Sequence, residues 1–132
     1  MAKHYMLDTD ICSYIIKNFN ENVGSKYGAH FDDCCISAIT YGELLYWVQK
    51  KNSQRLSESV HLLVDQLDIV PLDETAMGHY ARIRVELENA GTPTGSMDLL
   101  IAAGAMSAGA VLITHNTKHF AKIKGLKVED WL

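Results

Sequence analysis

Short apolar runs alternate along this sequence with longer segments in which apolar residues recur every three or four positions. The runs occupy residues 5–7, 34–37, 69–72 and 111–114. Runs of this length predict buried strands, and the spacing between them predicts helices. Strands that alternate with helices form a parallel sheet, because each connection crosses back over the sheet before the next strand begins. The sequence therefore predicts an α/β fold in which a short parallel β-sheet is sandwiched between helices.

The predicted helices fill the segments between these runs. The helix that begins near Ile39 has so few polar side chains that we expect it to be largely buried. Ser96 is predicted to be the N-cap of a helix rich in Ala and Gly. No linker or repeat interrupts the chain, and we expect one domain, residues 1–132. The expected helices cover 11–15, 39–47, 56–67, 74–87, 97–108 and 117–122, and an edge strand is expected at 126–128.

Composition and charge narrow the function classes. Hydrophobic residues make up 48% of the chain and charged residues 21%, as in ordinary globular proteins. The most apolar stretch, residues 99–113, is too short for a membrane span, and the first residues lack the apolar core of a secretory signal. We therefore expect a cytoplasmic protein without membrane contact. A net charge of −4 argues against coating nucleic acid through bulk charge, but it suits an enzyme that concentrates acids at a metal.

The cysteines indicate buried thiols. Cys12, Cys34 and Cys35 are odd in number and include an adjacent pair, which is poor geometry for a disulfide framework. A zinc site that combines Cys34 and Cys35 with His115 and His119 is an alternative, since histidines four residues apart share a helix face. The adjacent cysteines lack the spacing of a zinc knuckle, however. Reduced core thiols and surface histidines are the simpler interpretation.

Acidic side chains occur where the predicted strands end. Asp8 follows the first strand, Glu43 lies inside the helix after the second, and Asp98 opens the helix before the last. Ligands of open α/β sheets bind beyond the carboxyl ends of the strands, so these acids are expected to face one rim. Three neighbouring carboxylates repel unless a divalent cation neutralises them, and oxygen ligands suit Mg²⁺ or Mn²⁺. Such a metal activates water and stabilises a transferring phosphoryl group, which predicts phosphodiester hydrolysis.

Each acid has a structural alternative when it is taken alone. Asp8 or Asp10 can cap the first helix. Glu43 can be a solvated surface residue, and Asp98 can be favoured by the positive end of its helix. The combination favours a shared site over separate structural roles.

Four motifs in order give the chain a recognisable pattern. They are Met6-Leu7-Asp8-Thr9-Asp10, Ile36-Ser37-Ala38-Ile39-Thr40-Tyr41-Gly42-Glu43-Leu44, Asp98-Leu99-Leu100-Ile101-Ala102-Ala103, and Val111-Leu112-Ile113-Thr114-His115-Asn116 through Phe120. In order and spacing the chain resembles the PIN-domain ribonucleases, and more closely the VapC toxins of bacterial type II toxin-antitoxin modules. The resemblance spans almost the whole chain and implies a PIN-like domain with metal-dependent endoribonuclease activity.

The resemblance also implies roles for single residues. Asp8, Glu43 and Asp98 match the metal-binding acids of the family. Thr114 matches a hydroxyl residue beside the metal, and Asn116 stands where many members carry a fourth acid. This neutral side chain departs from the family pattern and argues against a second tightly held metal ion, though not against the first.

The expected partners come from the same resemblance. It implies a homodimer, a cognate VapB-like antitoxin that covers the active site, and a tRNA substrate, with the anticodon loop of initiator tRNA as the nearest pattern. Residues 40–67 carry more apolar surface than two helices easily bury, so we expect this hairpin to form a groove for an amphipathic antitoxin segment. The apolar residues are Tyr46, Trp47, Leu56, Val60 and Leu63.

Two basic clusters are candidate phosphate contacts, although a run of charge is usually a solvated face. The first begins beside the proposed site, near the end of the chain. It contains His115, Lys118, His119, Lys122, Lys124 and Lys127, and the second contains Lys50, Lys51 and Arg55.

Two rival functions remain open at this point. Asp8-Thr9-Asp10 also resembles the opening motif of haloacid-dehalogenase-type phosphatases, in which Asp8 would be the nucleophile and Asp10 a general acid. That family needs an acidic pair after a late strand, where this chain has His115-Asn116-Thr117. The second rival is a non-catalytic PIN-like domain that only binds a partner or RNA, and the retention of three acids argues against it.

Overall fold

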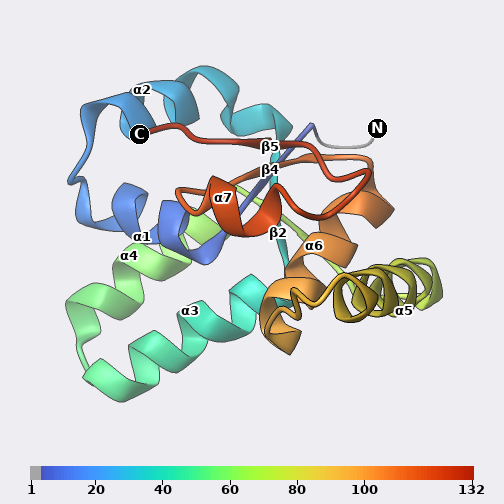
Figure 1. Ribbon diagram of the computed structural model, residues 1–132. Coiled ribbons are helices and arrows are strands. Elements are labelled where there is room, and N and C mark those ends of the chain that lie inside the picture. Colours follow the sequence, from blue (N-terminus) through green and yellow to red (C-terminus); the bar gives the residue numbers. More distant parts are fainter. Residues whose placement is uncertain (1–3) are drawn as a thin grey trace.

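The computed structural model describes residues 4–132 and contains a five-stranded sheet (Figure 1). The strands lie in the order β3-β2-β1-β4-β5, and every neighbouring pair runs parallel. In the central strand, Met6 pairs with Cys35 on one side and with Leu112 on the other. The predicted parallel sheet is confirmed. Its strands are β1 (Tyr5–Leu7), β2 (Cys34–Ser37), β3 (Asp68–Val70), β4 (Val111–Ile113) and β5 (Val128–Glu129).

Helices connect the strands and cover both faces of the sheet. Helix α2 is absent from the sequence-based expectation, because it buries apolar side chains only at Val23 and Tyr27. It begins at an N-cap, where the Asn20 side chain accepts a hydrogen bond from Val23 N. The helices are α1 (Thr9–Lys17), α2 (Glu21–His30), α3 (Ala38–Lys51), α4 (Gln54–Val64), α5 (Glu74–Asn89), α6 (Ser96–Ala108) and α7 (Thr117–Phe120), with a 3₁₀ turn at Phe31–Asp33.

The start of α6 differs from the expectation by one residue. Ser96 is the first helical residue, and Gly95 occupies the N-cap without a side-chain hydrogen bond. The prediction that Ser96 is the cap is therefore wrong. Glycine is itself tolerated at N-caps, so the helix can begin without the help of the serine hydroxyl. Asp98 consequently lies in the first turn of α6.

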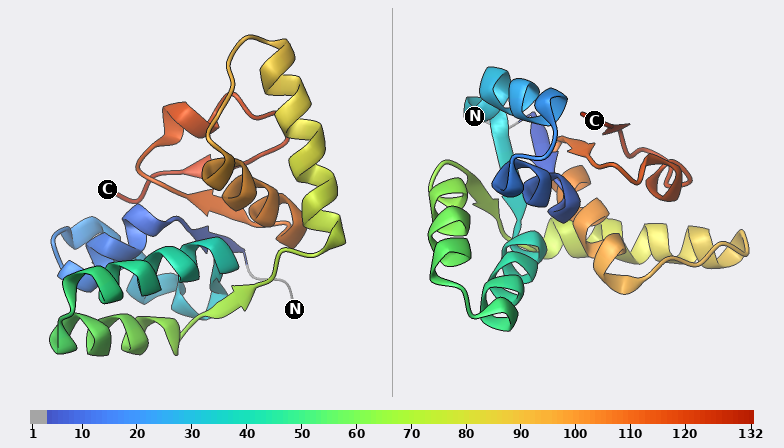
Figure 2. Two further views of the ribbon diagram at one scale, coloured as in Figure 1. Left: turned by 90° about the horizontal axis from the view of Figure 1, so that it is seen from below. Right: turned by 90° about the vertical axis from the view of Figure 1, so that its left-hand side faces the viewer.

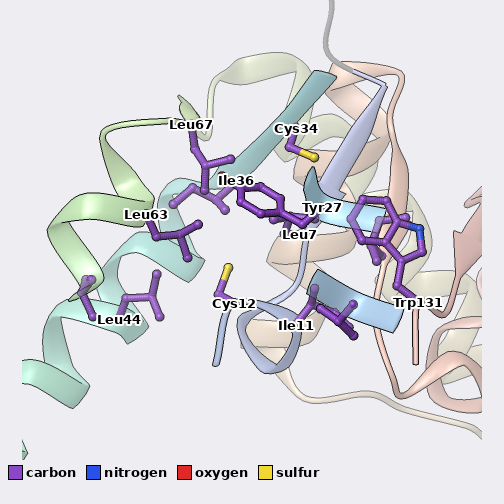
Figure 3. Packing of buried hydrophobic residues seen from close by; sticks show 13 residues of the cluster. Leu7, Ile11, Cys12, Tyr27, Cys34, Ile36, Leu44, Leu63, Leu67 and Trp131 are labelled. Carbon is purple, nitrogen blue, oxygen red and sulfur yellow. The ribbon is translucent and has the colours of Figure 1, made fainter. Parts of the chain in front are cut away.

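Successive residues of each strand point to opposite faces of the sheet and divide the core in two. Leu7, Ile36 and Ile113 pack against side chains from α1 to α4 (Figure 3). Met6 and Leu112 face the other way and pack against α5 and α6. Figure 2 shows the same division, with α1 to α4 on one side of the sheet and α5 and α6 on the other. The expected α/β/α layering is confirmed.

The same alternation separates the adjacent cysteines. Cys34 belongs to the first core cluster together with Cys12, whereas Cys35 belongs to the second. All three are buried, and none of them forms a disulfide within residues 4–132. Because Cys34 and Cys35 lie on opposite faces of the sheet, they cannot share one zinc ion with His115 and His119. The expectation of reduced core thiols holds.

Helix α3 is more exposed than its composition suggests. Thr40 and Leu44 are fully buried, but Gly42 is exposed and the Tyr46 side chain is 64% exposed. The expectation of a largely buried helix is wrong, because only Thr40 and Leu44 of α3 are buried and its other side chains are partly or fully exposed. The exposed apolar side chains among them are therefore available for contact with other molecules.

The most apolar stretch of the chain, residues 99–113, forms most of α6 and all of β4. Leu99, Ile101 and Leu112 are buried there in the second core cluster. Among residues 4–132, no helix is both long enough and apolar enough to cross a membrane.

Candidate active site

Asp8 lies directly after β1, at the carboxyl edge of the sheet. Its backbone is extended, with φ −70° and ψ 162°, and it is the N-cap of α1. Its Oδ1 accepts a hydrogen bond from Thr9 N at 2.8 Å, and its Oδ2 accepts one from Thr114 Oγ1 at 2.9 Å. One carboxylate oxygen thus caps the helix, as the structural alternative requires, while the other is held by the residue that follows β4.

Burial makes Asp8 difficult to ionise. The residue is 8% exposed, and desolvation is the main cause that raises its pKa from 3.8 to about 6. The negative charges of Asp10 and Asp98 act in the same direction, whereas the hydrogen bonds from Thr114 and Thr9 lower the pKa. A buried carboxylate with acidic neighbours is stabilised by a cation beside it.

Thr9 connects Asp8 to the acid on α3. Its backbone N–H contacts Asp8, and its hydroxyl Oγ1 donates a hydrogen bond to Glu43 Oε1 at 2.5 Å. The hydroxyls of Thr9 and Thr40 lie 3.2 Å apart. Glu43 is therefore drawn toward the sheet edge and is not a freely solvated surface residue. The sequence analysis gave Thr9 no role in the site. Its position between Asp8 and Asp10 was the one sequence feature that could have indicated such a role.

Asp98 reaches the same edge of the sheet from the first turn of α6. Its Oδ2 lies 2.9 Å from Nε2 of His119 on α7, at ion-pair distance but without hydrogen-bond alignment. The influence of Asp98 on the Asp8 pKa places its charge near Asp8. His119 was considered only as a basic residue or a zinc ligand, and the structure sets it against an acid of the proposed site.

Asp10 has a structural role in the loops around the site. Its carboxylate accepts hydrogen bonds from Ile11 N at 2.7 Å and from His115 N at 3.1 Å. Burial is the largest cause that raises its pKa, and these two hydrogen bonds oppose the rise. Asp10 therefore ties the start of α1 to the loop after β4, and both of its oxygens are engaged.

Asn116 follows β4, as expected, and Thr114, which was expected to end the strand, lies directly after it. Thr114 is fully buried, and besides its donation to Asp8 it accepts a hydrogen bond from Asn116 N at 3.1 Å. Asn116 is exposed at the N-cap of α7, where its side chain makes no capping hydrogen bond. Thr114 is thus fixed within the site, whereas Asn116 is exposed at its rim.

The proposed acids stand in two connected groups. Thr9 links Asp8 with Glu43, and Asp98 pairs with His119. Within residues 4–132, no set of three or more His, Cys, Asp or Glu side chains stands close enough to hold a metal ion directly. The donor chemistry nevertheless fits a hard cation, because Asp8, Glu43 and Asp98 offer carboxylate oxygens and the charges that act on Asp8 are those of the acids Asp10 and Asp98.

The residues of the first basic cluster do not lie together in the structure. Lys118 lies on α7 beside the site, whereas Lys122 and Lys124 line a cavity at the carboxyl end of α5. Lys127 directly precedes β5 and so lies toward the opposite edge of the sheet. In the second cluster, Lys50 lies on the exposed part of α3, with its Nζ 5.8 Å from the ring centroid of Tyr46.

Known proteins match this chain along nearly all of its length. A family model for the PIN domain matches residues 5–126. The tRNA(fMet)-specific endonuclease VapC of Shigella flexneri is 36% identical over 128 residues, which cover 96% of this chain and 97% of that protein. The protein of the same name from Salmonella typhimurium is 37% identical over 128 residues, with the same coverage.

A solved structure agrees with these sequence matches. In the crystal structure of VapBC2 from Rickettsia felis bound to a DNA fragment from their promoter, one chain matches with a TM-score of 0.90 and 32% identity, covering 97% of this chain and 98% of that chain. The matches decide against a haloacid-dehalogenase-type phosphatase built on Asp8 and Asp10, and the relatives' names decide against a purely non-catalytic domain. The chain therefore belongs to the PIN-domain family and, within it, to the VapC ribonucleases.

Proposed function

We propose that this VapC ribonuclease is a Mg²⁺- or Mn²⁺-dependent endoribonuclease toxin that cuts tRNA and is neutralised by a VapB-like antitoxin. The observation that carries the metal dependence is the state of Asp8, a buried carboxylate whose pKa is raised to about 6 by desolvation and by its acidic neighbours. A divalent cation would offset both effects.

Asp8, Glu43 and Asp98 would hold the cation. When bound, it supplies a positive charge for the transferring phosphoryl group and activates a water molecule. Glu43 would keep Oε1 on the Thr9 hydroxyl and offer its other carboxylate oxygen to the ion. Asp98 would have to leave or share its contact with His119. The hydroxyl of Thr114 keeps one Asp8 oxygen in a fixed position. Asn116 contributes no charge, so three formal negative charges would face the ion and one ion would bind tightly.

The substrate proposal rests on the relatives. Two proteins that match nearly the whole chain at 36% and 37% identity are named tRNA(fMet)-specific endonucleases. We therefore propose initiator tRNA as the substrate, with the cut in the anticodon loop, where unstacked bases are accessible to a protein. The weakly acidic chain binds RNA through local cations such as Lys118 and Lys50 rather than through its net charge.

The partner proposal combines the relatives with the hairpin of α3 and α4. The relative from Rickettsia felis was crystallised as VapBC2, which supports a VapB-like partner and, through the promoter DNA in that complex, a cytoplasmic place of action. Val60 and Leu63 are buried in the core, so they offer little surface to a partner, contrary to expectation. A cavity between α1 and the hairpin remains for an amphipathic segment, and it is lined by Ile16, Lys17, Phe19, Trp47, Ser53, Arg55, Leu56 and Ser59. We also propose that the toxin forms a homodimer.

The test is cleavage of purified initiator tRNA, with elongator methionine tRNA as the comparison substrate. We expect Mg²⁺-dependent cleavage of initiator tRNA at one position, loss of cleavage in EDTA, and loss in Asp8→Asn. Asp65→Asn is the matched control, because Asp65 is an exposed acid at the end of α4. Undiminished cleavage in EDTA would refute the metal dependence, and equal cutting of both tRNAs would refute the substrate.

A further inference from the structure

A cavity opens directly beside Glu43, on the exposed face of α3. It has a volume of about 590 Å³, within the range of small-molecule binding sites. Its lining joins two residues of the active site to apolar side chains from α3 and α6. The lining residues are Thr9, Ala38, Ile39, Gly42, Glu43, Tyr46 and Met97.

The cavity is continuous with the candidate active site. Thr9 and Glu43, which lie in its wall, are joined by a hydrogen bond and connect to Asp8. Met97 immediately precedes Asp98 in the first turn of α6. Any group that fills this cavity therefore lies next to the acids that we propose to act on the scissile phosphate.

The exposed wall of the cavity has the chemistry of a stacking surface. The Tyr46 side chain is 64% exposed and Met97 is 49% exposed, so the aromatic ring and the thioether are open to a ligand. Lys50 Nζ lies 5.8 Å from the centroid of the Tyr46 ring and places a cation beside it. Aromatic rings bind RNA bases by stacking, and a neighbouring lysine binds the phosphates that flank them.

We propose that this cavity receives a nucleobase that flanks the scissile phosphate of the RNA. A base has an apolar face for Tyr46 and Met97, and its attached phosphate chain leads to Lys50 on one side and to the acids on the other. A purely apolar partner would make no hydrogen bond or ionic contact with Glu43 or Lys50. The inference rests on the proposed ribonuclease function and adds a contact that holds one base of the RNA beside the scissile phosphate.

Gly42 keeps the cavity open. It lies inside α3 with an exposed backbone, and a Cβ built on it meets nothing within 4 Å. A larger side chain at this position is therefore expected to extend into the cavity that Tyr46 also lines. Gly78 in α5 is also exposed and equally open, and it lies outside the cavity. It provides a matched control for the introduction of a large side chain into a helix.

The experiment measures kcat/KM on a synthetic stem-loop with the sequence of the initiator tRNA anticodon arm. After the cut has been mapped, each base that flanks the cleaved phosphate is replaced in turn by an abasic nucleotide. With the wild-type enzyme, one abasic substitution is expected to lower kcat/KM by about tenfold, as loss of one stacked base does. Gly42→Leu is expected to lower kcat/KM on the intact stem-loop by a similar factor, and Gly78→Leu to leave it unchanged.

The decisive reading is the combination of the two changes. If the base occupies the cavity, Gly42→Leu should cut the abasic stem-loop as fast as wild type does, because the interaction has already been removed. If the Gly42→Leu substitution and the abasic substitution each lowered kcat/KM independently, so that the two factors multiplied, the inference would be overturned. The inference would also be overturned if Gly42→Leu left the effect of the abasic substitution unchanged but altered the oligomeric state or abolished antitoxin binding. The cavity would then bind a second copy of the chain or the antitoxin. If wild type cuts no RNA, the proposed function itself fails and this inference with it.

Discussion

Replacement of Asp8 by asparagine should remove cleavage and, in the metal-free protein, raise stability. Asparagine keeps the shape of the side chain and the oxygen that accepts the hydrogen bond from Thr9 N. It removes the negative charge that burial and the neighbouring acids disfavour. Thr114, which now donates to the carboxylate, can turn its hydroxyl to accept from the new amide.

The size of the effect follows from the pKa of Asp8. A rise from 3.8 to about 6 means that ionisation of this buried group costs the folded state about 3 kcal/mol at neutral pH. Rearrangement of the Thr114 hydrogen bond offsets part of this stabilisation. We therefore expect Asp8→Asn to raise the free energy of unfolding by about 2 kcal/mol. In a chain of this length, that gain raises the midpoint of thermal unfolding by roughly 8 °C.

The pH dependence has a definite sign. A carboxyl whose folded-state pKa is raised destabilises the fold when it is ionised, so the cost is absent below pH 3.8 and complete above about pH 6. The stability advantage of Asp8→Asn should therefore be largest at pH 7.5 and should shrink as the pH falls toward 4. Wild type should gain stability from this group over the same interval.

Thermal unfolding in EDTA, followed by circular dichroism at pH 7.5 and pH 4.5, measures this directly. With Mn²⁺ in place of EDTA, wild type should be stabilised more than Asp8→Asn, since stabilisation by a ligand grows with its affinity for the folded protein. An Asp8→Asn protein that is less stable than wild type at pH 7.5 in EDTA would refute the electrostatic reasoning. A gain that does not change with pH would refute it as well.

Further predictions address the surroundings of this acid. Thr9→Val should lower cleavage roughly tenfold with the fold intact, because Glu43 loses its hydrogen bond, and Thr9→Ser should restore cleavage; single-turnover rates decide this. Asn116→Asp should raise the affinity for a second Mn²⁺ ion in the RNA-free protein, as measured by calorimetry; unchanged affinity would show that this side chain does not limit occupancy. Cys12, whose thiol pKa burial raises, should resist iodoacetamide at pH 8 until the protein unfolds, and rapid labelling of the native protein would contradict its burial.

The part of this site that lies next to strands could be predicted from the sequence. Asp8 directly follows a short apolar run and Thr114 ends another, and parallel topology brings the ends of such runs to one edge. Glu43 and Asp98 lie on helices, and their approach to Asp8 was expected from their places beside the predicted strands, to which the family resemblance added the role of metal ligands. The burial of α3 was predicted wrongly, because the apolar content of a helix does not say which of its faces is covered.

The contacts between the acids could not be predicted. Thr9 meets Glu43 across two βα units, and His119 meets Asp98 only because α7 folds back toward the start of α6. Such pairs depend on how helices are placed on the sheet, which the pattern of one sequence does not specify. Helix α2 was missed for a related reason, since it contacts the core through too few apolar residues to show a helical period.

The most direct test of the shared metal site is calorimetric titration of the RNA-free protein with Mn²⁺. We predict one tightly bound ion in wild type and an affinity at least about tenfold weaker in each of Asp8→Asn, Glu43→Gln and Asp98→Asn, because each variant removes one charge facing the ion. Wild-type affinity in any two of these variants would contradict the account, since the three acids would then not hold one ion together.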